Sequence, residues 1–236
     1  MTETKESAVA ELRARGLTPK EVARRLGMRP AEVNDLIRAQ ARHAADPNAV
    51  PRLAGSFVSP GWSAGLGIDA EARAWRDLDP APDSGRGLLA VLVARENRYA
   101  KVSVCAYLVD AYCLGVKDAM GPRTMEPERY EVFVRQYFQH AFTAAPVAVP
   151  IELAQGLVHG AVEYARQLGF EPCADFGAAA PHLGRLAGGA RITFGDHGRP
   201  HYISGPHDDA ARVVATLRRT VGEGNFDFTL VSGPAT

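Results

Sequence analysis

The stretch from Leu17 to Arg42 constrains the fold more than any other part of the sequence. Its capping and turn residues fix where two short helices begin and end. Thr18 can cap the first helix, and Glu21 is placed to complete a capping box with it. Gly27 follows the apolar positions of that helix, where a tight turn requires a positive φ. Pro30 then suits the first turn of a second helix. The sequence predicts two helices joined by a short glycine turn.

The apolar residues of this stretch recur at helical spacing and predict one buried seam between the two helices. They are Val22, Ala23, Leu26, Met28, Val33, Leu36 and Ile37. This order of small, glycine and apolar positions resembles the helix-turn-helix motif of bacterial regulators. A further helix is expected before Gly16, so that residues 1–45 form a small all-α helix-turn-helix domain of three helices. The resemblance implies double-stranded DNA as the partner, while a three-helix protein-docking module is the alternative reading.

The residues expected to contact DNA lie away from the apolar seam of the second helix. They are Arg29, Ala31, Asn34, Asp35 and Arg38. Between Glu11 and His43 the sequence holds eight Arg and Lys residues against four Asp and Glu residues. That excess suits phosphate contacts, although Glu32 and Asp35 oppose tight non-specific binding.

The composition indicates an ordinary globular protein that is neutral overall, with 27 basic and 27 acidic side chains. No apolar run is long enough to cross a membrane, and the first ten residues lack the apolar core of a signal peptide. The three cysteines, Cys105, Cys113 and Cys173, form no CxxC pair. Reduced thiols and a cytoplasmic location are therefore expected.

The length suits a small domain followed by a larger one. Asp46-Pro47 disfavours continuation of the second helix, so residues 46–55 are expected to be a linker and residues 56–236 a second domain. Within that domain the stretch from Ser56 to Asp69 contains Pro60-Gly61 and further glycines, and predicts a turn-rich loop with Trp62 as a hydrophobic anchor.

The second domain mixes strand and helix patterns in separate runs, which predicts an α+β fold. Antiparallel hairpins are expected from residues 88–95 with 101–110, and from 191–195 with 200–204. Amphipathic helices are expected over residues 128–141, 151–168 and 208–221, with Gln155 and His159 facing outward on the second of them. Residues 225–231 alternate as a last strand, with Phe226, Phe228 and Leu230 on one face.

Two further stretches carry a family resemblance. They are YLVDAYCLGVKD, residues 107–118, and FGDHGRPHYISGPHDD, residues 194–209. Both resemble the hallmark stretches of a widespread family of uncharacterised bacterial proteins, and the helix of residues 151–170 and the GEGNFDF segment fit it too. The resemblance covers residues 58–230. It implies a recurring domain joined here to a helix-turn-helix, and it brings no catalytic residues with it.

An enzymatic reading rests on Asp110, Lys117 and Asp118, which are expected at the end of a strand and in the turn after it. Carboxylates at a strand end with a nearby lysine can hold a hard metal ion and a phosphate, as in nucleases. The acid-x-lysine pair of restriction-like nucleases is absent, because Gly115 and Val116 precede the lysine. The plainer reading is a buried Asp110 bonded to backbone beside a solvated turn.

Other reactive side chains give weaker patterns. Cys113 could act as a thiol nucleophile with His159 or His182 as its base, but no motif supports this role. A small, buried structural cysteine is the plainer reading. The residues His197, His201, His207, Asp208 and Asp209 match no standard zinc spacing. The Gly-rich runs at 65–67 and 184–189 lack the residues of nucleotide-binding loops. We therefore expect no bound metal and no cofactor.

Three functions remain open from the sequence. The first is a DNA-binding transcriptional regulator whose α+β domain dimerises or senses a partner or ligand. The second is a metal-dependent hydrolase of nucleic acid targeted by the N-terminal domain, and the third is a protein-interaction adaptor. A homodimer is expected for the regulator because one helix-turn-helix covers only a half-site. Its candidate surfaces are Phe133, Tyr137 and Phe138, or the face of Gly156 and Gly160.

Overall fold

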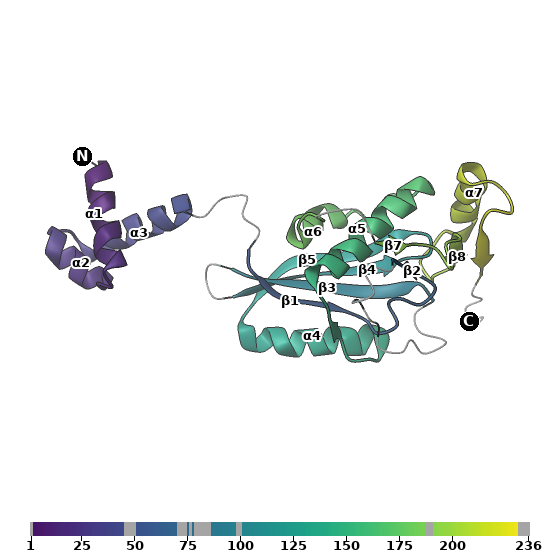
Figure 1. Cartoon of the computed structure of the whole chain (residues 1–236), viewed down its shortest axis with the longest axis horizontal. Helices are drawn as coiled ribbons and strands as arrows, with labels where there is room; N and C mark the ends of the chain where they lie inside the picture. The colour runs from purple at the N-terminus through teal and green to yellow at the C-terminus, as the bar shows by residue number, and fades with distance from the viewer. Residues whose placement is uncertain are drawn as a thin grey trace. The chain divides into compact units, whose positions relative to one another are not determined.

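A computed structural model of the chain describes residues 2–44, 51–69, 75, 77, 86–97, 101–186 and 191–230. The chain divides into two compact units, Met1–Val50 and Pro51–Thr236. Figure 1 shows the elements of both units.

The first unit consists of three helices, α1 (Thr2–Ala14), α2 (Pro19–Leu26) and α3 (Pro30–Ala44). The capping box predicted at Thr18 is present, since its hydroxyl accepts from the Glu21 amide and the Glu21 carboxylate accepts from the Thr18 amide. Gly27 ends α2 with φ of +63°. The three helices enclose a small core of Val9, Leu12, Val22, Ala23 and Val33.

The second unit is built on a five-stranded antiparallel sheet. Its strands, in spatial order, are β5 (Gly115–Met125), β4 (Val102–Asp110), β3 (Leu88–Glu96), β1 (Leu53–Val58) and β6 (Val147–Ala148). The predicted hairpin of residues 88–95 with 101–110 is confirmed as β3 and β4, whose pairing runs from Leu88 with Asp110 to Glu96 with Val102.

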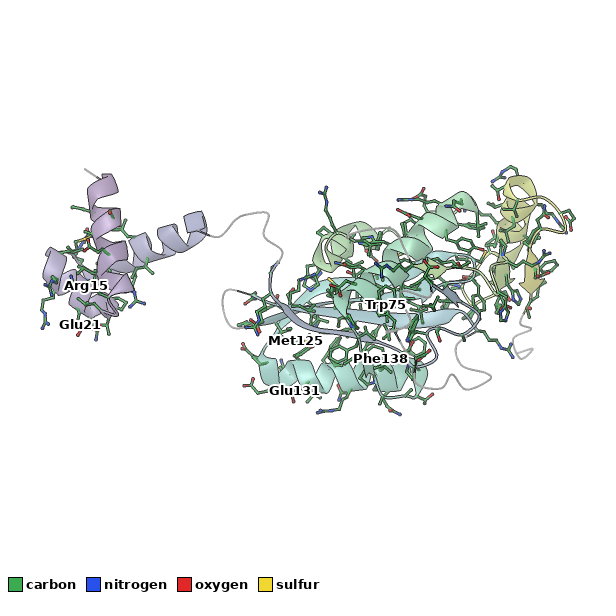
Figure 2. The ribbon with its side chains drawn as sticks, viewed as in Figure 1. Arg15, Glu21, Trp75, Met125, Glu131 and Phe138 are labelled. Atoms are coloured by element: carbon green, nitrogen blue, oxygen red, sulfur yellow. The ribbon has the colours of Figure 1, made fainter. Side chains whose placement is uncertain are left out.

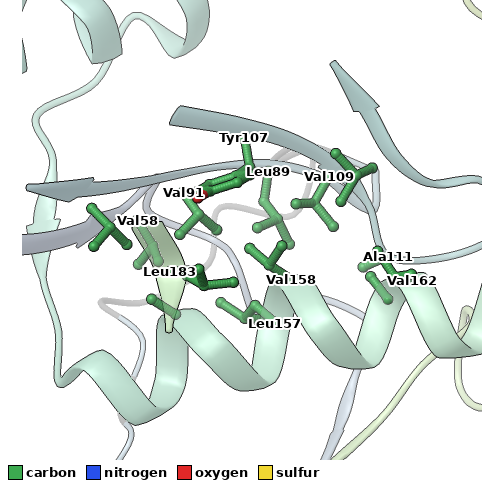
Figure 3. Packing of buried hydrophobic residues seen from close by; sticks show 14 of the residues in the cluster. Val58, Leu89, Val91, Tyr107, Val109, Ala111, Leu157, Val158, Val162 and Leu183 are labelled. Carbon is green, nitrogen blue, oxygen red and sulfur yellow. The ribbon is translucent and has the colours of Figure 1, made fainter. Parts of the chain in front are cut away.

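Helices cover both faces of this sheet (Figure 1). On one face α5 (Ile151–Gln167) and α6 (Phe176–Leu183) pack over alternate residues of β3 and β4, and Figure 3 shows Leu157 and Val158 of α5 beside Leu89 and Val91. On the other face α4 (Pro127–Phe142) packs over the intervening residues, with Phe138 fully buried, as labelled in Figure 2. Two covered faces explain why β3 reads as a continuous apolar run. Burying one aliphatic side chain completely, rather than leaving it exposed, stabilises the folded chain by about 1.5–3 kcal/mol.

Buried polar side chains attach α6 to the sheet. Arg95, only 6% exposed, donates from Nε to the carbonyl of His182 (2.6 Å) and from Nη2 to that of Leu183 (3.0 Å). The Tyr107 hydroxyl donates to the carbonyl of Ala179 (2.8 Å). Gln155 of α5 is also buried and donates to Leu183, so its predicted outward position is wrong.

The predicted second hairpin is also wrong. β7 (Ile192–Thr193) pairs antiparallel with β2 (Gly67–Ile68), whereas β8 (His201–Ile203) pairs parallel with β9 (Asp227–Thr229). The helix α7 (Ala210–Thr220) connects β8 to β9, as a parallel pair requires. Phe226 is buried in a third cluster with Leu217, but Phe228 is 46% exposed, so the last strand does not bury one continuous face.

The entry into the second unit is more ordered than expected. The stretch taken as linker and turn-rich loop contains β1 and β2, although residues 61–65 do form turns and Trp62 is buried as predicted. The predicted break at Asp46-Pro47 lies outside the described residues. Of the two proposed dimer surfaces, the face of Gly156 and Gly160 is interior, since both glycines are buried in α5. In the other, Phe138 is fully buried, whereas Phe133 and Tyr137 are only partly buried.

Candidate functional site

The exposed side of α3 is the first candidate site. Val33 is fully buried against α1 and α2, with Leu36 and Ile37 partly buried beside it. Ala31, Asn34 and Asp35 are exposed on the remaining surface of the helix. The structure thus separates the apolar seam from the side chains expected to contact DNA. The side chain of Arg38 lies outside the described residues.

Arg29, at the start of α3, is tied to an acidic neighbour. Its guanidinium Nη2 lies 2.9 Å from Glu32 Oε1, and its backbone amide donates to Glu32 Oε2 (3.0 Å). These hydrogen bonds, the side-chain one above all, lower the pKa of Glu32 and keep it charged. This ion pair was not predicted from the sequence. In it, the charge of Arg29, which was expected to contact DNA, is already balanced by Glu32.

The two stretches that carry the family resemblance meet at one end of the sheet. The Gly195 amide donates to the carbonyl of Ala111 (3.0 Å), and the His201 amide donates to that of Tyr112 (3.2 Å). The rings of Tyr112 and His201 are stacked with centroids 6.3 Å apart. Residues more than eighty positions apart in the sequence therefore form one continuous site.

Asp110 ends β4 inside this site. Its Oδ1 accepts from the backbone amides of Tyr112 and Cys113, both at 3.0 Å. Burial raises the pKa of Asp110 to about 6, and this effect outweighs the opposing influence of the Lys117 ammonium and the backbone amides. This geometry supports the simpler of the two interpretations from the sequence. Asp110 is a buried carboxylate whose hydrogen bonds to backbone hold the turn after β4.

Lys117 reaches the same region through an irregularity in β5. Val116 pairs with Val109 and Asp118 pairs with Leu108, so Lys117 is an extra residue in the ladder. Such a bulge redirects the side chain of the inserted residue. Nζ of Lys117 lies 2.7 Å from Asp208 Oδ2, in a pair whose side chains are 20% and 11% exposed. Lys117 and Asp118 lie in a strand, and the predicted turn is wrong.

Asp208 is held by several donors at once. Its Oδ2 also accepts from the Gly205 amide (2.8 Å) and from the Tyr202 hydroxyl (3.4 Å). Burial alone would raise the pKa of Asp208, but the hydrogen bonds from Lys117 and Gly205 leave it below its ordinary value. Lys117 therefore pairs directly with Asp208, and its charge also favours the ionised form of Asp110. Asp118 is exposed, and its carboxylate accepts from the Ala119 amide.

Among the described residues, neither histidine considered as a base for Cys113 is paired with its thiol. Cys113 is fully buried, and burial, with Asp110 adding to it, raises the pKa of its thiol. His159 instead contacts the carbonyl of Gly184 (2.9 Å), and His182 lies at the end of α6 beside Arg95. Neither histidine is brought to the thiol.

The histidines of the second stretch are dispersed. Nδ1 of His201 lies 3.1 Å from Asp196 Oδ2, and its Nε2 lies 3.0 Å from the Thr229 hydroxyl, which joins β8 to the turn before it and to β9. His197 is exposed, and His207 lies beside Asp208. Within the described ranges no group of three or more His, Cys, Asp or Glu side chains is placed to hold a metal ion.

Sequence reasoning overlooked Tyr202 and Thr229. Tyr202 was only a weak signal, although the structure buries it fully. Its hydrogen bond with Asp208 depends on how the chain folds between the two residues, which the local sequence does not show. Thr229 gave no signal, since its contact with His201 depends on parallel pairing of β8 and β9.

Among the helices that the structure describes, none is both long and apolar enough to cross a membrane. Comparison of the chain with protein-family models, with curated proteins and with solved structures finds no match.

Proposed function

We propose that the protein is a DNA-binding regulator that reads double-stranded DNA through α3. The observation that carries the proposal is the arrangement of α2 and α3. A capped helix, a glycine turn and a second helix share one buried seam, and α3 keeps an exposed side that includes Ala31 and Asn34. In helix-turn-helix proteins the second helix enters the major groove with its first turns on the base edges.

The charges around α3 suit a phosphate backbone. Arg24 and Arg25 are exposed on α2, and Arg29 is exposed at the start of α3. Cations in these positions would contact phosphates on either side of the groove, while Asn34 has the donor and acceptor needed for an adenine edge. The second unit would then supply dimerisation or the sensing of a ligand.

Selection from a pool of random duplexes at low salt tests the proposal. We expect one sequence class to be enriched, with Asn34→Ala weakening binding to it by about 5- to 150-fold and relaxing specificity at one base pair. Arg24→Gln is the matched comparison on α2. It should weaken binding evenly across sequences and reduce the salt dependence. A selection that enriches no sequence would show that the chain is not a DNA reader.

A further inference from the structure

An open cleft lies at the Lys117–Asp208 pair in the second unit. It has a volume of about 720 Å³ and is bounded by the start of β5, the loop after α5 and the first turns of α7. This volume falls in the range of small-molecule sites, which hold about 300–1,000 Å³. The hydrolase reading used Lys117, but none of the three functions considered from the sequence identified this cleft.

The cleft has an apolar part. Leu114, Val116, Phe170 and Val213 line it, and Val116 is nearly fully buried as part of the main core. A ligand that lies on these side chains would remove apolar surface from water, which contributes roughly 25 cal/mol per Å². The occupant should therefore have an apolar body.

The acceptors in the cleft are engaged within the chain. Asp208 accepts from Lys117, Gly205 and Tyr202, and Asp209 caps α7 by accepting from the Arg212 amide (3.0 Å). Glu171 pairs with Arg166 at 2.9 Å. Each acidic side chain of the lining thus has a donor before any ligand arrives.

The donors are less fully used. Arg212 lines the cleft and is exposed, and across the described part of the chain its guanidinium has no hydrogen bond or ion pair. Lys117 has three N–H groups, of which one is directed to Asp208. The planar guanidinium fork of Arg212 matches the two oxygens of a carboxylate. The N–H groups of Arg212 and Lys117 that remain unused in the cleft therefore favour a ligand that accepts hydrogen bonds and carries a negative charge.

We propose that this cleft binds a small organic carboxylate with an apolar tail. The carboxylate lies against Arg212 and the remaining N–H groups of Lys117, and the tail lies on the partly exposed Leu114, Phe170 and Val213. The proposal concerns the second unit alone and stands independently of DNA binding by α3.

Calorimetric titration of the full chain with three probes of equal tail length tests the charge preference. Octanoate is the anion, octylamine the cation and octan-1-ol the neutral probe. We expect octanoate to bind at least tenfold more tightly than the other two, because a charge-assisted hydrogen bond exceeds a neutral one. Equal affinities of octanoate and octanol, tighter octylamine, or no heat with any probe at millimolar concentration would overturn the proposal.

The position is tested with two arginines of α7. Arg212→Gln should lower the affinity for octanoate about tenfold, and it removes no side-chain hydrogen bond or ion pair within the described chain. Arg219→Gln, on the last turn of the same helix and outside the cleft, should leave it unchanged. Unchanged tryptophan fluorescence of both variants checks the fold. An Arg212→Gln variant with wild-type affinity would place octanoate elsewhere and overturn the assignment.

Discussion

The buried carboxylate of Asp110 links the stability of the second unit to pH. Its pKa in the folded chain is raised from 3.8 to about 6, mainly by burial. When the pH falls from 7 to 4, the folded chain takes up a proton that the unfolded chain does not yet bind, so this group adds stability below pH 6 and loses it as the pH rises through 6. Asp208 has a lowered pKa, so its own loss of stability comes only below this window.

Comparison of wild type with Asp110→Asn isolates this effect. Asparagine keeps the acceptor for the amides of Tyr112 and Cys113 but does not titrate. Between pH 7.5 and 4.5 the free energy of unfolding of wild type, relative to the variant, should rise by about 2 kcal/mol. Urea unfolding followed by tryptophan fluorescence reports on this unit, because Trp62 and Trp75 both lie in it. A constant difference across the range would contradict the raised pKa.

The Glu32 side chain is expected to restrain DNA binding. It neutralises Arg29 and places a negative charge on the surface offered to phosphates. Glu32→Gln keeps an acceptor for the Arg29 amide but removes the charge, so affinity for duplex DNA should increase several-fold at low salt and less at high salt. Fluorescence anisotropy at two salt concentrations measures the change. Weaker binding by the variant would mean that Glu32 itself makes a favourable contact.

The turn between α2 and α3 depends on one left-handed residue. A Cβ at Gly27 would meet nothing within 4 Å, so Gly27→Ala costs only backbone strain, about 1–2 kcal/mol. Amide exchange in α2 and α3 should quicken about 5- to 30-fold, whereas Gly27→Asn should have a smaller effect. Gly177→Ala, inside α6 and equally uncrowded, should have the opposite sign and slow exchange there. Unchanged exchange in Gly27→Ala would show that the turn is not held in this conformation.

The elements predicted correctly are those whose apolar residues follow a local period. The β3–β4 hairpin and the helices α4 and α5 belong to this group. β1 was missed because Gly55 and a buried Ser56 interrupt its pattern, and the hydroxyl of Tyr130 and the ring of Phe57 crowd the glycine. β5 was missed because it carries charges and a bulge at the edge of the sheet. Pairing partners, rather than local sequence, define both strands.

The candidate site shows the same limit. A buried Asp110 that bonds to backbone could be predicted, because a carboxylate after an apolar strand has few other partners. The Lys117–Asp208 pair joins residues 91 positions apart and depends on the bulge that redirects the lysine. On α3 the buried and exposed sides followed from helical spacing, whereas the Arg29–Glu32 pair was within reach of the sequence as an i, i+3 contact.

The division of the chain into two units predicts where a protease should cut. The boundary falls at Val50 and Pro51, close to the predicted break at Asp46-Pro47. Brief digestion with an endoproteinase that cleaves before aspartate should cut first at Asp46 and release a lasting fragment that ends at Thr236. Mass spectrometry identifies the fragments. Earlier cleavage at the largely buried Asp208 would argue against a stable second unit.

The full chain is expected to be a dimer if it reads a symmetric operator. A pair of first units spans two half-sites one helical turn apart. The exposed apolar residues Leu88, Val132 and Phe228 remain available for an interface, since Phe138 is interior. Light scattering of the full chain at tens of micromolar should give twice 25.3 kDa. A monomer mass would remove the symmetric operator and favour recognition of a single half-site.

The distance in sequence between Lys117 and Asp208 has a consequence during synthesis, because the chain leaves the ribosome from its N-terminus. The sheet is complete in sequence long before Tyr202 and Leu217, which cover Cys113, have been made. A nascent or prematurely ended chain therefore lacks part of the cluster that encloses Cys113 and the aspartate that pairs with Lys117. Asp208 and then Leu217 are supplied late in synthesis, so the surroundings of Lys117 and Cys113 are completed only once residue 217 has been made.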